Sequence, residues 1–214
     1  MDRDQKHIDA IKNLSEKSGI EMVVIDETEK ITKTDAARFA RRLMLSSYIN
    51  DPIQSIIRQE TPKGKTVELP GISFLVDHHE IEKLVDILNK KFAYRNCIAF
   101  ISDNSFRDDK KQTISIIHST DKYNALRLQE TSGGSYIFST DSLITNLNNL
   151  EQKYPFDFTG VGSDWVAIKI KSTPVDWEDL AKEILKVCPN EETTIKEFAE
   201  ALQKNNGQTT MWWD

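Results

Sequence analysis

Apolar residues recur at helical spacing in some segments of the chain and alternate with polar residues in others. Ile8, Ile11 and Leu14 share one helical face, which predicts an amphipathic helix that ends at Gly19. Three further elements are predicted before residue 60: a strand over 20–25, a helix over 35–48 and a short helix over 53–58. The first part of the chain is therefore predicted to run helix, strand, helix.

The same patterns continue through the rest of the chain. They predict strands over 72–76, 97–102, 113–118, 164–171 and 209–213, and helices over 78–91, 121–129, 143–150, 177–187 and 194–204. The charged stretch 103–112 between two of these strands predicts a hairpin loop. Strands separated by helices and by one hairpin indicate an α+β fold, a mixed β-sheet covered by helices.

A segment with proline and glycine, Thr61-Pro62-Lys63-Gly64-Lys65, is the best candidate for a linker. We therefore expect two parts. Residues 1–66 form an N-terminal helix-strand-helix elaboration, and residues 67–214 form the main α+β domain.

The last 27 residues are the most informative. Cys188-Pro189 closes a predicted helix, and the sequence ends on Trp212-Trp213-Asp214. Each tryptophan offers roughly 150 to 250 Å² of largely apolar surface. Alternation along the final strand points the two rings to opposite sides, so we expect one of them in the core. A salt bridge from Asp214 is favoured over acid-base chemistry.

This ending resembles that of a bacterial family described as domain of unknown function 4253. The segments that carry the resemblance are Cys188-Pro189, the helix over 194–202, Trp212-Trp213-Asp214, and the upstream runs 119–123, 126–127, 131–136 and 160–165. The similarity extends from about Leu69 to Asp214. Asn190 and Ser135 depart from it, since members often have Asp and Asn at those two positions. The resemblance implies no particular chemistry.

Composition narrows the class of protein. The chain has 214 residues, 38% hydrophobic and 29% charged, with a net charge of -6. An acidic chain is a poor general binder of polyanions, so we expect no nucleic acid partner and favour a basic one. The absence of a long apolar run or a secretory leader predicts a cytoplasmic protein without a membrane span. Two cysteines are too few for a disulfide framework.

Neither a metal site nor a cofactor is expected. The four histidines, His7, His78, His79 and His118, do not form a His-Glu-x-x-His motif. A zinc site using His78 and Glu82 would still need two more ligands. Cys188 at a helix C-terminus would have a raised pKa, which disfavours a thiolate nucleophile.

The preferred site surrounds the glycine-containing loop 132–135. Its candidate ligand- or partner-binding residues are Asp121, Tyr123, Arg127, Thr131, Gly134, Tyr136, Asp164 and Trp165. Arg127 and Tyr123, four residues apart, would grip a carboxylate or phosphate from one helix face. The alternative is an internal ion pair between Asp121 and Arg127, with the loop serving as a helix cap.

We therefore expect a non-catalytic cytoplasmic protein that binds another protein, with no catalytic residue assigned. Its favoured form is an immunity protein that neutralises a basic toxin, because charge complementarity speeds such an encounter. The alternative is a hydrolase or transferase that acts on a small anionic substrate in a pocket near Arg127.

Overall fold

The structure is a computed structural model that describes residues 3–34, 53–59, 66–77, 81–103, 111–133, 139–190 and 192–213. The chain divides into two compact units, Met1–Thr120 and Asp121–Asp214. The predicted α+β class is confirmed, with a mixed sheet. The predicted domain boundary at residues 66 and 67 stays a prediction.

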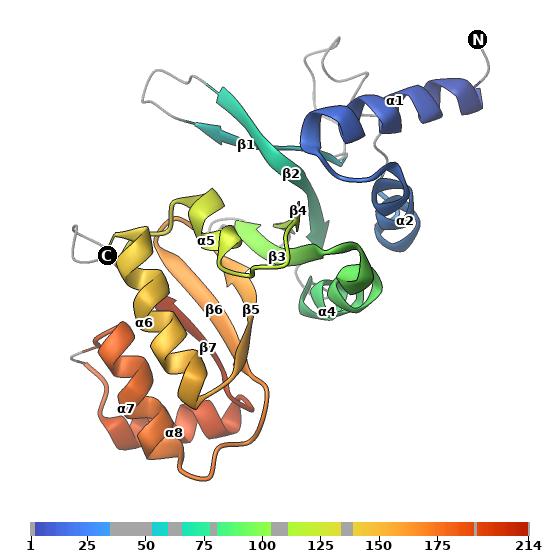
Figure 1. Cartoon of the computed structure of the whole chain (residues 1–214). Helices are drawn as coiled ribbons and strands as arrows, with labels where there is room; N and C mark the ends of the chain where they lie inside the picture. The colour runs from blue at the N-terminus through green and yellow to red at the C-terminus, as the bar shows by residue number, and fades with distance from the viewer. Residues whose placement is uncertain are drawn as a thin grey trace. The chain divides into compact units, whose positions relative to one another are not determined.

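The N-terminal unit combines helices with an antiparallel arrangement of strands (Figure 1). Its elements are α1 (Arg3–Ser18), α2 (Met22–Thr32), β1 (Gln54–Gln59), β2 (Thr66–Asp77), α4 (Ile81–Phe92), the short 3-10 helix η2 (Ala93–Arg95), β3 (Cys97–Asp103) and β4 (Lys111–His118). The strand order is β1-β2-β4-β3. Strands β3 and β4 pair antiparallel, which confirms the predicted hairpin.

Two predicted elements of this unit are wrong. The run 20–25 is not a strand, because helix α2 begins at Met22 and buries Val24, Ile25 and Thr28 on one face. A short turn separates it from α1, in which Ser18 Oγ accepts a hydrogen bond from Ile20 N. The expected N-terminal helix-strand-helix order is therefore replaced by two consecutive helices.

The second error concerns residues 53–58, which form strand β1 rather than a helix. This strand pairs antiparallel with β2, and its Ile56 is buried. A segment this short gives little periodicity to separate a helix from a strand, and the long-range pairing decides the outcome. The helix predicted over 35–48 lies outside the described residues.

The C-terminal unit contains α5 (Asn124–Gln129), α6 (Thr140–Lys153), β5 (Phe156–Val161), β6 (Trp165–Ile170), α7 (Trp177–Val187), α8 (Ile195–Lys204) and β7 (Gln208–Trp212). Its strands lie in the order β5-β6-β7, and both neighbouring pairs are antiparallel. The last two helices and the last two strands match the predicted segments. Strand β5 was not predicted.

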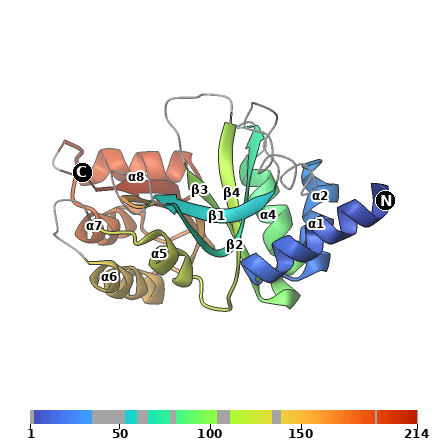
Figure 2. The same ribbon diagram turned by 90° about the horizontal axis from the view of Figure 1, so that it is seen from above.

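Capping residues determine where two helices of this unit begin, and apolar residues determine which helix faces are buried. Asp176 caps α7 by accepting hydrogen bonds from the backbone N–H groups of Glu178 and Asp179. Thr194 and Glu197 form a reciprocal capping box at the start of α8. The buried residues of α6 and α7 include Leu143, Leu147, Leu150, Leu180 and Ile184. Figure 2 shows these two helices side by side. No helix in the described part of the chain is long and apolar enough to cross a membrane.

Candidate functional site

Arg127 forms hydrogen bonds with side chains at the start of α5 and in the turn before it. Asp121 accepts a hydrogen bond from the backbone N–H of Tyr123 at 2.9 Å and another from Arg127 Nη1, also at 2.9 Å. The same Arg127 nitrogen donates to Asn124 Oδ1 at 2.8 Å. Asp121 and Arg127 therefore form the internal ion pair that the sequence analysis gave as the alternative to ligand binding. Both side chains remain about half exposed.

Tyr123 has a different partner from Arg127. Its ring is buried and packs edge-on against Phe158, with 5.5 Å between the ring centroids. Its hydroxyl donates to Glu151 Oε2 at 2.8 Å. Burial of the hydroxyl raises the pKa of Tyr123, and its hydrogen bond to Glu151 adds to the effect. Tyr123 and Arg127 therefore do not form a joint binding site for an anion, because the ring of Tyr123 lies in the core and the side chain of Arg127 lies on the surface.

Lys122, which the sequence analysis did not single out, lies at the centre of this cluster. Its ammonium pairs with Glu151, donates to the backbone carbonyl of Phe156 at 2.6 Å, and lies 4.0 Å from the centroid of the Phe156 ring. Burial lowers the pKa of Lys122, while its hydrogen bond to Glu151 opposes that shift. Glu151 thus holds Lys122 and Tyr123 together, an arrangement that ties α5 to α6 and β5.

A second group of the predicted residues meets at the turn before β6. Thr131 is fully buried, and its hydroxyl donates to the carbonyl of Gly162 at 2.6 Å. The indole of Trp165 lies against Gly162 so closely that a Cβ there would be 2.0 Å from Nε1. Only glycine fits this position without moving Trp165. Asp164 contributes its backbone carbonyl, which accepts from Trp213 N at 2.9 Å.

The C-terminal residues dock the last strand onto the end of α7. Trp213 is buried, and its indole N–H donates to the carbonyl of Val187 at 3.2 Å. The Cys188 thiol donates to the carbonyl of Trp212, also at 3.2 Å. Burial raises the pKa of the Cys188 thiol, which is the direction expected from the sequence. Cys188 and Trp213 are therefore structural.

The two adjacent tryptophans have different environments. Trp213 is 7% exposed, whereas Trp212 is 41% exposed on β7 beside its β6 neighbour Trp165. This confirms that one of the pair is core. Pro189 is exposed next to Cys188. Gly134, Tyr136 and Asp214 lie outside the described residues.

Charge is distributed unequally between the units. The sequence of the N-terminal unit has 19 acidic and 19 basic residues, and that of the C-terminal unit has 15 acidic and 9 basic residues. The entire net charge of -6 therefore belongs to the C-terminal unit. Within the described part of that unit, Glu178, Glu192 and Glu200 have exposed side chains that form no ion pair.

A comparison with known protein families supports the resemblance that the C-terminal residues indicated. Residues 113–214 match the model of a family described as Domain of unknown function (DUF4253). The resemblance that the sequence predicts is therefore confirmed over this part of the chain. The match includes most of β4 and the whole C-terminal unit. It does not extend over the residues from Leu69 to Gln112 that the resemblance also included. Searches of curated proteins and of solved structures gave no match.

Proposed function

We propose that the C-terminal unit is a protein-binding module and that its partner is a basic protein. The observation that carries this proposal is the location of the whole net charge of -6 in this unit. Complementary charge raises the rate of encounter with a partner of opposite sign and selects against acidic ones.

The exposed indole of Trp212 is the proposed apolar anchor of the interface. Tryptophan is enriched among the residues that contribute most to binding, because its large surface loses water on contact. The Cys188 thiol donates a hydrogen bond to the carbonyl of Trp212 and helps to hold this strand in place. An exposed tryptophan on a unit of negative net charge suits a basic partner with an apolar patch.

The polar groups around α5 support binding over catalysis. Arg127 pairs with Asp121, Tyr123 donates to Glu151, and the hydroxyl of Thr131 donates to a backbone carbonyl. Each of these groups stabilises the unit itself. A catalytic site would instead direct such groups toward a reacting atom.

The finer proposal is that the partner is a basic toxin which the protein neutralises. Covering a basic active surface requires an acidic, well-folded protein and no catalytic residue of its own. This form makes a distinct prediction: the complex should abolish the activity of its partner at equimolar ratio.

Charge reversal provides the test. Glu192→Lys with Glu200→Lys changes the charge of the C-terminal unit by +4, from -6 to -2. The control, Glu16→Lys with Asp86→Lys, makes the same total change in the N-terminal unit. Capture from a lysate of the source cells should retain a basic protein on the wild type and on the control, and much less on the first variant. Equal retention by both variants would refute the proposed surface.

A further inference from the structure

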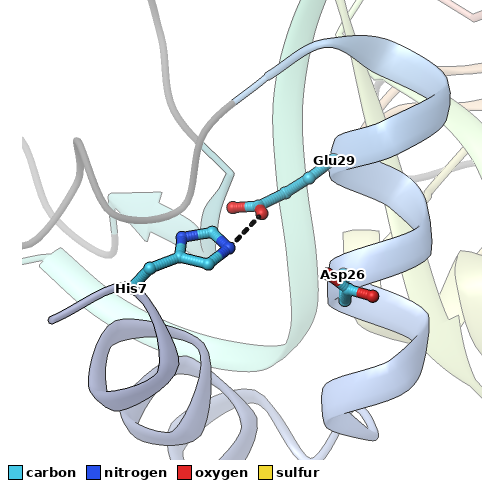
Figure 3. Close-up of side chains that lie close together, drawn as sticks. All are labelled: His7, Asp26 and Glu29. Atoms are coloured by element: carbon cyan, nitrogen blue, oxygen red, sulfur yellow. Dashed lines mark ion pairs between the residues drawn. The ribbon is translucent and has the colours of Figure 1, made fainter. Parts of the chain in front are cut away.

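Two neighbouring helices of the N-terminal unit bring three metal-ligating side chains together. His7 projects from α1, and Asp26 and Glu29 lie one turn apart on α2 (Figure 3). One ligand atom from each residue lies within 4.8 Å of the other two. His7 Nε2 and Glu29 Oε2 are 3.1 Å apart.

From this arrangement we propose that His7, Asp26 and Glu29 form a binding site for a divalent transition-metal ion of the zinc class. One imidazole nitrogen with two carboxylate oxygens is a donor set that Zn²⁺ accepts. With ligand bonds of about 2.0 to 2.1 Å, tetrahedral donors lie about 3.4 Å apart. The pair from His7 and Glu29 is already close to this spacing. Rotation of the Asp26 carboxylate supplies the remaining approach, and water completes the coordination.

The burial of Glu29 is compatible with a bound cation. Its side chain is only 9% exposed, compared with 38% for His7. A carboxylate removed from water is costly unless a positive charge or hydrogen-bond donors compensate it. His7 supplies a charge only when it is protonated. A bound divalent ion would add a positive charge to the partners that Glu29 already has, with the neutral imidazole of His7 as a second ligand.

Lys30 is the competitor of the proposed ion. Its ammonium lies 2.6 Å from Asp26 Oδ2, and this partner raises the pKa of Lys30. A metal ion that binds Asp26 must displace Lys30 from this ion pair. Exposed ion pairs contribute little to stability, so the cost is small. Removing the ammonium should therefore strengthen metal binding without touching a ligand.

Titration calorimetry of the untagged full-length chain with Zn²⁺ tests the site. We expect one ion per chain in the wild type. His7→Ala and Glu29→Gln should each weaken the affinity by at least tenfold, and Lys30→Ala should tighten it severalfold. His118→Ala removes an exposed histidine of the same unit, and Cys188→Ala removes a half-buried thiol of the other unit. Both controls should bind as the wild type does.

Three outcomes would overturn the proposal. They are the absence of saturable binding, wild-type affinity in His7→Ala or Glu29→Gln, and loss of binding in Cys188→Ala. An unchanged affinity in Lys30→Ala would remove Asp26 from the ligand set and contradict the three-residue site. Far-UV circular dichroism of each variant separates lost coordination from lost folding, and Glu29→Gln keeps an acceptor for His7.

Discussion

Trp212 and Trp213 are adjacent in sequence, yet Trp213 is assigned to the core and Trp212 to the surface. The two residues therefore form a matched pair for mutation. Trp213 is 7% exposed and donates its indole N–H to the carbonyl of Val187. Truncating a buried aromatic side chain to alanine costs about 3 to 5 kcal/mol. Trp212 is 41% exposed, and Trp212→Ala should cost roughly 1 to 2 kcal/mol on the same scale.

Urea unfolding, monitored by tryptophan fluorescence, measures this difference in stability within the C-terminal unit. All four tryptophans of the chain, Trp165, Trp177, Trp212 and Trp213, belong to the C-terminal unit. With an m-value of about 2 kcal/mol/M, Trp213→Ala should lower the midpoint by roughly 2 M and Trp212→Ala by less than about 1 M. Far-UV circular dichroism checks that the loss of one fluorophore does not create the shift.

The comparison of the two variants decides the assignment. The reasoning fails if Trp213→Ala loses less than about 1 kcal/mol, or if it loses no more than Trp212→Ala. Either result would mean that the last strand is not locked to α7 through Trp213.

Three other predictions follow from single contacts. Arg127→Ala removes a half-exposed ion pair and should lower the unfolding free energy by no more than about 1 kcal/mol; a loss of activity on a small anionic substrate in this folded variant would favour the hydrolase or transferase alternative. Burial raises the pKa of Cys97 to about 11, so at pH 8 iodoacetamide should alkylate it on the order of a hundredfold more slowly than in the urea-unfolded chain; equal rates would contradict its burial. Hydrogen bonds from Lys186 and Lys153 lower the pKa of Glu183 below its usual 4.5. Its stabilisation is present above that value and is lost as the pH falls through the lower value in the folded protein, so the acid-induced drop in stability should be smaller in Glu183→Gln.

The amphipathic helices could be predicted from the sequence because local signals agree with the tertiary packing. In α7 and α8 the apolar stripe, the Asp176 cap and the Thr194–Glu197 capping box all mark the same boundaries. Strand β5 escaped prediction because Gly160 interrupts its pattern at an irregularity in the pairing with β6. The β-branched run 20–25 favoured a strand locally, but its apolar face packs as part of a helix.

The site residues were harder to predict than the fold. Sequence spacing placed Tyr123 and Arg127 on one helix face, but Tyr123 lies in the turn before α5 and its ring enters the core. Lys122 gave no signal because its aromatic and carboxylate neighbours come from distant segments. The cluster around His7 was missed for a related reason. Reading residues 20–25 as a strand hid the helical spacing of Asp26 and Glu29.

Binding of a basic protein through the C-terminal unit is the central claim, and one measurement tests it most directly. The wild type, Trp212→Ala, the Glu192→Lys/Glu200→Lys variant and its N-terminal control are each used to capture partners from the source cells, with proteins and small molecules identified by mass spectrometry. The account predicts a stoichiometric basic protein on the wild type and the control that is depleted on the other two variants. A retained metabolite without a protein partner, or a partner held equally by all four chains, would contradict it.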